Sequence, residues 1–144
     1  MDRPMLEVKN LRIRYASAPT DAVRNVSFTL GRERLGIVGE SGSGKSTVGR
    51  ALLRLLPSAA VTADTLRFDD LELLSLSERQ MLKVRGRRMS MILQDPKFSL
   101  NPIQRVGHQV AETYLRHFRC SKADARAKAI DMLASVKIRD PARV

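Results

Sequence analysis

The sequence contains few of the residues that form disulfides, metal clusters or aromatic cores. Its 144 residues include one cysteine, Cys120, no tryptophan and an aromatic content of 4%. A single cysteine excludes an internal disulfide, which fits a reducing cytosol, and without other cysteines nearby it does not suggest a metal site. His108 and His117 are isolated from one another in the sequence, and neither is expected to bind a metal. We expect these three residues to serve packing or the surface.

Long apolar runs and acidic residues are also scarce. No stretch reaches the roughly 18 apolar residues that cross a bilayer, and the N-terminus lacks the apolar core of a signal peptide. Any membrane role is therefore expected to be peripheral. With 15 acidic and 26 basic residues, the net charge is +11. This charge favours polyanionic partners, which could be a nucleotide, a nucleic acid or an anionic membrane surface.

A phosphate-binding motif occupies residues 39–47. Its residues are, in order, Gly39, Glu40, Ser41, Gly42, Ser43, Gly44, Lys45, Ser46 and Thr47. They fit the P-loop pattern G-x-x-x-x-G-K-[ST], in which small residues let successive backbone N–H groups cradle phosphates before a helix begins. Lys45 would reach the β- and γ-phosphates, and the Ser46 hydroxyl would coordinate Mg²⁺. The alternative is a Gly/Ser-rich linker, but a flexible linker does not require Lys-Ser-Thr at the start of a helix.

The residues on both sides of this motif also favour a P-loop. Residues 35–38, Leu-Gly-Ile-Val, are predicted to form a short buried strand that enters the loop. A helix is predicted after Lys45 and before Pro57, because apolar residues follow at helical spacing. These apolar residues are Val48, Ala51, Leu52 and Leu55.

Two antiparallel strands are predicted before the P-loop, at residues 6–15 and 26–30. In the first, the apolar alternation changes phase near Asn10, which indicates a β-bulge. Tyr15 ends this strand, where its ring could stack on a purine base. Without further context, a half-buried strand tyrosine is the simpler interpretation.

The segment after the P-loop helix predicts a strand at residues 65–68 and a short helix at residues 77–84. Ser77 would cap this helix, and Gln80 would complete a capping box. A basic run overlaps the helix, which could contact a polyanion but more commonly forms a solvated face. Its members are Arg79, Lys83, Arg85, Arg87 and Arg88.

Residues 90–93 are predicted to form a further apolar strand that ends at Gln94-Asp95-Pro96. This is not a Walker B strand, because Gln94 interrupts the run before Asp95 and Pro96 breaks the chain. Residues 99–102 predict an exposed turn. Helices follow at residues 106–118 and from Ser121 to before Pro141. Asp124, three residues after Ser121, would form a shorter analogue of a capping box. The expected buried faces of these helices are Val106, Val110, Thr113, Tyr114 and Phe118 on the first, and Ala123, Ala127, Ile130, Leu133 and Ala134 on the second.

The order of Tyr15, residues 39–47 and residues 91–96 closely resembles the ATP-binding subunit of an ABC transporter, with its A-loop aromatic, Walker A motif and Q-loop. Residues 36–46 and 94–102 resemble the oligopeptide, dipeptide and nickel importer branch in particular. This resemblance implies that ATP and Mg²⁺ bind, that Tyr15 stacks on adenine, and that Gln94 ligands Mg²⁺ and positions the attacking water.

The resemblance also implies partners and a location. The loop after Gln94, at residues 97–105, would contact transmembrane permease subunits, and a second ATP-binding subunit would complete a homo- or heterodimer. A solute-binding protein would be an indirect partner in the uptake of peptides or a related small solute. The chain would then lie peripherally at the cytoplasmic face of the inner membrane.

The fold implied by the resemblance is an α/β P-loop NTPase. We expect an antiparallel β subdomain at residues 1–34, a P-loop core at residues 35–95 and the start of a helical subdomain at residues 96–144. The family's LSGGQ-type motif, Walker B carboxylates, D-loop and switch histidine do not occur in these 144 residues. We therefore expect the N-terminal part of an ABC ATPase domain, with the C-terminal part missing and without efficient hydrolysis of its own.

Two alternatives remain open from the sequence. The +11 charge would suit an ABC-type ATPase that acts on nucleic acid, in repair or on the ribosome. Against this, the basic residues are not interleaved with exposed aromatics, and the residues after Gln94 resemble the importers. A nucleotide-binding remnant without catalysis is the second alternative.

Overall fold

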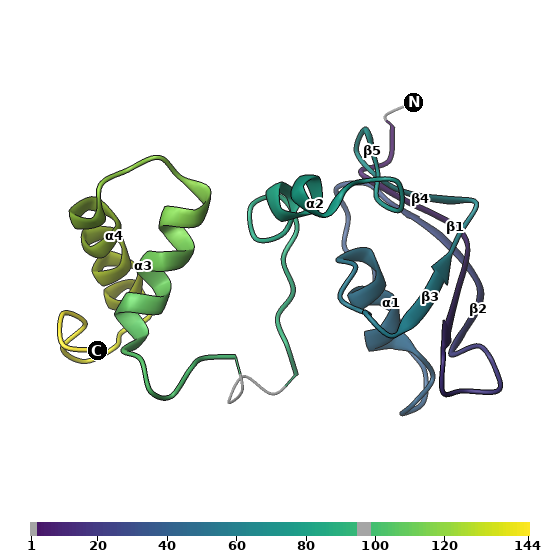
Figure 1. Ribbon diagram of the computed structural model, residues 1–144, viewed down its shortest axis with the longest axis horizontal. Helices are drawn as coiled ribbons and strands as arrows, with labels where there is room; N and C mark the ends of the chain where they lie inside the picture. Colours follow the sequence, from purple (N-terminus) through teal and green to yellow (C-terminus); the bar gives the residue numbers. More distant parts are fainter. Residues whose placement is uncertain (1–2, 95–98) are drawn as a thin grey trace. The chain divides into compact units, whose positions relative to one another are not determined.

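The computed structural model describes residues 3–94 and 99–144, which form two compact units divided between Met91 and Ile92. The first unit contains a β-sheet with two helices, and the second contains a pair of helices (Figure 1). The predicted boundary between residues 95 and 96 falls shortly after this division. Asp95 and Pro96, like the start of the predicted permease loop at Lys97 and Phe98, lie outside the described residues.

The sheet of the first unit is built around its longest strand. In the described residues all strand pairs are antiparallel, in the order β2-β1-β4-β5, with β3 also beside β1. The first half of β1 pairs with β4, and its second half pairs with β3 on the same edge. The strands are β1 Leu6–Tyr15, β2 Val23–Leu30, β3 Ala59–Thr62, β4 Thr65–Phe68 and β5 Leu71–Glu72.

The predicted β-bulge in the first strand is confirmed. Asn10 has a φ of 53°, and the register with β2 shifts between Val8 and Leu11. The Asn10 backbone N–H donates to Ser27 Oγ at 2.9 Å. The antiparallel pair and the strand at residues 65–68 are confirmed as well, whereas β3 and β5 were not predicted. Both are short, and neither shows the alternation that identifies a strand in isolation.

Helix α1, Lys45–Leu52, lies against this sheet and starts where the P-loop pattern predicts. It ends before the expected limit at Pro57, because Arg54 takes a left-handed conformation with φ 52°. The N–H of Arg54 donates to Ala51 O at 2.9 Å and that of Leu55 to Arg50 O at 2.9 Å, which is a Schellman termination. The core between helices and sheet includes Val8, Leu11, Ile13, Val48, Ala51, Leu66, Leu73, Met81 and Val84.

Both predicted capping boxes are present. Helix α2, Glu78–Val84, has Ser77 and Gln80 bonded to each other's backbone, and α4, Lys122–Ser135, has Ser121 and Asp124 in the same arrangement. Each box satisfies backbone N–H groups that the first helical turn leaves without a partner.

The second unit is a hairpin of α3, Val106–His117, and α4. On α3, Val110 and Tyr114 pack against the core as predicted, but the buried residue is Ala111, and Thr113 is exposed. On α4 the predicted face was right only in part, because Leu133 is buried and Ile130 is half-buried, whereas Ala123, Ala127 and Ala134 are exposed. Its buried residues are Ala125, Ala129 and Leu133, which are spaced four apart. The two alanines are small, so α3 can pack closely against this face of α4.

The prediction of strands at residues 35–38 and 90–93 was wrong. Both segments lack regular structure. Val38 is 92% exposed and Ile92 is 96% exposed. A strand requires a neighbour for its backbone groups, and no strand of the described chain pairs with either segment.

Candidate nucleotide-binding site

The P-loop turns from residues 35–38 into α1, and Gly44 is the residue that makes the turn possible. Gly44 caps α1 with a φ of 92°, a left-handed conformation that favours glycine. A Cβ atom at this position would lie 2.8 Å from Ala22 O and 3.0 Å from Val23 Cγ2. The glycine therefore lets the loop pass directly beside the start of β2.

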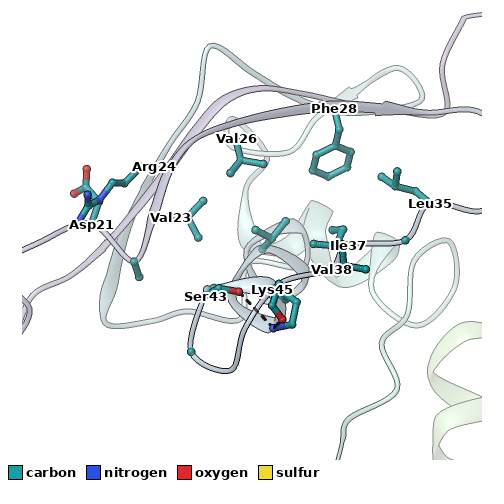
Figure 2. A pocket seen from close by; sticks show the side chains of 16 residues that line it. Asp21, Val23, Arg24, Val26, Phe28, Leu35, Ile37, Val38, Ser43 and Lys45 are labelled. Atoms are coloured by element: carbon teal, nitrogen blue, oxygen red, sulfur yellow. Dashed lines mark hydrogen bonds between the residues drawn. The ribbon is translucent and has the colours of Figure 1, made fainter.

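The Lys45 side chain folds back over the loop. Its Nζ donates to Gly39 O at 2.8 Å, Glu40 O at 2.5 Å and Ser43 Oγ at 3.4 Å. The Ser43 N–H in turn donates to Glu40 O at 3.2 Å. Figure 2 shows Lys45 and Ser43 together at the mouth of the loop. The ammonium group thus lies over the loop backbone, where a phosphate group would meet it.

The N-terminus of α1 is free to receive an anion. The first-turn N–H groups of any helix, here those around Ser46 and Thr47, lack intrahelical acceptors. Among the described residues no side chain caps them, so they are available to a ligand. At Gly42, with φ 81°, an added Cβ atom would meet nothing within 4 Å. Donors of this kind, at the positive end of a helix dipole and beside a lysine, suit a phosphate group. The Ser46 hydroxyl is exposed at the same end, as a Mg²⁺ ligand would need to be.

A cavity of about 730 Å³ adjoins the loop, within the range of small-molecule sites. Figure 2 shows the side chains of Val23, Val26 and Phe28 on β2 across from Lys45. This wall was not predicted from the sequence. The alternation of Val26 and Phe28 indicated one common face, but nothing local indicated that this face turns toward the P-loop. The lining also includes Asp21, Ala22, Arg24, Val48, residues 35–39 and residues 42–44.

The charged groups of this cavity leave it positive. Asp21 is bound by Arg14, with Nε 2.6 Å from its Oδ1. Lys45 and Arg24 also line the cavity, and within the described chain no ion pair engages either of them. An anionic ligand would therefore meet uncompensated cations.

Not all predicted site residues come together. Glu40, Ser41, Ser46 and Thr47 belong to the loop and first helical turn but do not line the cavity. Tyr15 is half-buried at the end of β1, opposite Ala59 of β3, and it does not line the cavity either. Gln94 is exposed and belongs to the second unit. The adenine and Mg²⁺ contacts of Tyr15 and Gln94 remain predictions.

Two arginines of the basic run form structural contacts within the first unit, instead of belonging to a purely solvated face. Arg88 binds Asp69 at 2.7 Å and lies 5.3 Å from the centre of the Phe68 ring. Arg85 binds Glu78, and its hydrogen bond holds the pKa of that carboxyl below the usual range. These engaged cations leave less charge for a polyanion than the sequence suggests.

Comparison with known proteins settles the family. Residues 23–144, which include the P-loop and helices α1 to α4, match the family described as ABC transporter. The chain belongs to the ABC transporter family. The resemblance drawn from its motifs is thereby confirmed, and its sheet and helices are those of an ABC ATPase domain.

Several curated members of this family are similar along most of the chain. A probable peptide ABC transporter ATP-binding protein of Sinorhizobium fredii is 45% identical, over 96% of this chain and 43% of that protein. A dipeptide transport ATP-binding protein of Lactococcus lactis is 43% identical, over 96% and 41%. An oligopeptide transport ATP-binding protein of Salmonella typhimurium is 44% identical, over 93% and 41%. The chain thus spans less than half the length of these relatives.

Two structural features bear on membranes and metals. Across residues 3–94 and 99–144, no helix combines the length and apolar character of a membrane span. In the same residues, no cluster of three or more His, Cys, Asp or Glu side chains could hold a metal ion.

Proposed function

We propose that this chain carries the ATP-binding half-site of an ABC importer for peptides or a related small solute. The observation that carries the proposal is the P-loop itself, an uncapped α1 N-terminus and Lys45 beside an open, positively charged cavity. The family and the names of the three relatives described above support a peptide importer. ATP supplies the phosphoryl group, and Mg²⁺ neutralises charge on its phosphates.

The P-loop residues have separate roles in this proposal. Lys45 exchanges its contacts with the Gly39 and Glu40 carbonyls for contacts with the β- and γ-phosphates. The backbone N–H groups of residues 42–47 would donate to phosphate oxygens, and the Ser46 hydroxyl would ligand Mg²⁺. Tyr15 would stack on adenine, and Gln94 would ligand Mg²⁺ and position the attacking water, as the family resemblance implies. Val23 and Phe28 supply an apolar wall that excludes water from one side of the nucleotide.

The loop at residues 99–105 is proposed to contact a permease at the cytoplasmic face of the membrane. Ile103 is 92% exposed, and Leu100 is 44% exposed. The Gln109 side chain holds this loop in shape, with Asn101 N donating to Oε1 at 2.8 Å and Nε2 donating to Asn101 O at 2.9 Å and Gln104 O at 3.0 Å. An ordered loop that displays apolar side chains is typical of a protein contact.

The direct test is a calorimetric titration of the 144-residue chain with ATP and Mg²⁺, with adenosine as the control. We expect saturable ATP binding and much weaker adenosine binding, because the P-loop recognises phosphates. We also expect turnover far below about 1 per second, the low end of typical enzymes, since the Walker B carboxylates do not occur in these residues. A folded chain without ATP binding would refute the proposal. Rapid hydrolysis would refute only its catalytic part.

A further inference from the structure

The side chain of Arg85 connects the end of α2 to the end of the P-loop helix. Arg85 follows α2 directly, and its backbone N–H donates to Met81 O at 2.9 Å. Its Nε donates to Leu53 O at 2.7 Å, and its Nη2 donates to Arg54 O at 3.2 Å. One guanidinium group thus binds two consecutive carbonyl groups at the C-terminus of α1.

The orientation of this guanidinium is itself fixed. Glu78, the first residue of α2, pairs with Nη1, and its Oε2 lies 3.4 Å from Nη2. The Arg85 side chain is only 20% exposed, whereas that of Glu78 is 62% exposed. Because a guanidinium is planar with its donors in a fixed fork, one carboxylate and two carbonyls define its plane.

A second arginine makes the connection in the opposite direction. Arg54 follows the end of α1, and its Nη1 donates to Leu76 O and, at 3.4 Å, to Leu73 O. Both acceptors lie in the segment between β5 and α2. Two arginines therefore connect the C-terminus of α1 to α2 and to the segment that precedes α2. Arg85 reaches from the end of α2 to α1, and Arg54 reaches from the end of α1 to that segment.

These ties matter because α1 has few other anchors. It contains eight residues, and only Val48 and Ala51 among them are buried. The negative end of its dipole lies at its last carbonyls, where a cation is favourable. The other end carries Lys45 and Ser46, about 12 Å away at 1.5 Å per residue. Rotation of the C-terminal end would therefore redirect the amides that face the phosphates.

We propose that Arg85 is a positioning residue for the nucleotide site: through Leu53 and Arg54 it sets the direction of α1 and so aims the P-loop donors at the phosphates. This inference rests on the proposed function of the P-loop. It assigns a role in ATP binding to a residue of the basic run that touches neither the loop nor the cavity.

The test compares Arg85→Lys with Arg88→Lys in the full chain. A lysine at position 85 keeps the charge but can reach only one acceptor at a time. We expect roughly five- to tenfold weaker ATP binding for Arg85→Lys, since small displacements of binding groups are costly. Arg88→Lys, from the same basic run but bound to Asp69, should stay within about twofold of the parent chain. In a ¹⁵N–¹H spectrum, the amide signals of residues 44–47 should shift in the first variant only.

Glu78→Gln provides a second variant, which keeps Arg85 but removes the charge that orients it. We expect a loss of ATP affinity between those of Arg88→Lys and Arg85→Lys. If Arg85→Lys does not fold, Glu78→Gln takes its place as the test of the inference. Unchanged ATP affinity and unchanged P-loop amide signals in a folded Arg85→Lys or Glu78→Gln chain would overturn the inference. If the parent chain itself fails to bind ATP, the proposed function fails, while the amide signals still report whether Arg85 orients α1.

Discussion

Lys45 Nζ lies 2.8 Å from the carbonyl oxygen of Gly39, so the lysine of the P-loop binds the loop's own backbone. A phosphate group offers this ammonium a stronger, charge-assisted partner than a carbonyl. We predict that Lys45→Ala weakens ATP binding by more than tenfold, or about 1.5–3 kcal/mol, with little loss of thermal stability. Calorimetry and thermal unfolding would measure the two effects. Lys83→Ala, at an exposed position of α2, is the matched control, and equal ATP affinity in both variants would remove the P-loop assignment.

The stacking role of Tyr15 gives a prediction that separates an adenine contact from a structural tyrosine. Tyr15→Ala should weaken ATP binding by about 1–3 kcal/mol, the usual range for stacking of a base on an aromatic ring. Tyr15→Phe and Tyr15→Trp should be tolerated, because each keeps an aromatic face. The structure places Tyr15 at the end of β1, opposite Ala59 and outside the cavity lining. Equal losses for all three substitutions would therefore indicate a role in packing.

The features that could be predicted from the sequence are those that depend on neighbours in the chain. Alternation around Asn10 identified the first strand and its bulge, and the Ser77 and Ser121 patterns identified two helix starts. The left-handed Arg54 that ends α1 was missed, because no glycine or asparagine marks it.

The features that could not be predicted depend on distant parts of the chain. Residues 35–38 have the composition of a buried strand, yet a strand also requires a partner, and composition does not report one. The cavity wall on β2 was missed for a similar reason. Only the close approach of Gly44 to Ala22 brings the P-loop beside Val23 and Phe28.

The cap of α4 predicts a pH dependence in the second unit. The Ser121 hydroxyl donates to Asp124 Oδ2 at 2.7 Å and the Ser121 N–H donates to it at 3.2 Å, and these bonds hold the pKa of Asp124 below its usual range. A carboxyl with a lowered pKa in the folded state stabilises that state above its unfolded pKa, about 3.9. This contribution is then lost as the pH falls from there through the folded pKa.

Amide exchange of Ala125 and Ala129 between pH 3 and pH 6 would measure this effect. We expect protection to decline below about pH 4 in the parent chain. In Asp124→Asn the decline should be absent, because the amide does not titrate. Ser121→Ala should lower the stability of α4 by about 1 kcal/mol across the whole range, as the loss of an N-cap hydroxyl usually does. The same pH profile in the parent chain and in Asp124→Asn would contradict this account.

Cross-linking can test the permease contact of residues 99–105. Cys120 is the only cysteine, so Cys120→Ser provides a background without thiols. Ser99→Cys, beside exposed Leu100, should then cross-link to cytoplasmic loops of the permease in membranes that contain the transporter. Arg79→Cys, exposed on α2, is the control and should react poorly. Efficient cross-linking at Arg79→Cys with none at Ser99→Cys would place the contact elsewhere.

Exposure of residues 35–38 predicts that this 144-residue chain associates in solution. Leu35 and Ile37 are 45% and 47% exposed, Val38 is 92% exposed, and no strand of the described residues pairs with them. Unpaired backbone groups beside apolar side chains favour edge-to-edge pairing between chains. We expect concentration-dependent association at micromolar concentrations in light scattering, and less of it after Val38→Lys, which adds a charge to the segment. Ile103→Lys is the matched control, because Ile103 is also 92% exposed but lies in a turn that Asn101 and Gln109 hold in place. A monomer with a sharp cooperative unfolding transition, unaffected by Val38→Lys, would show that this segment does not drive association.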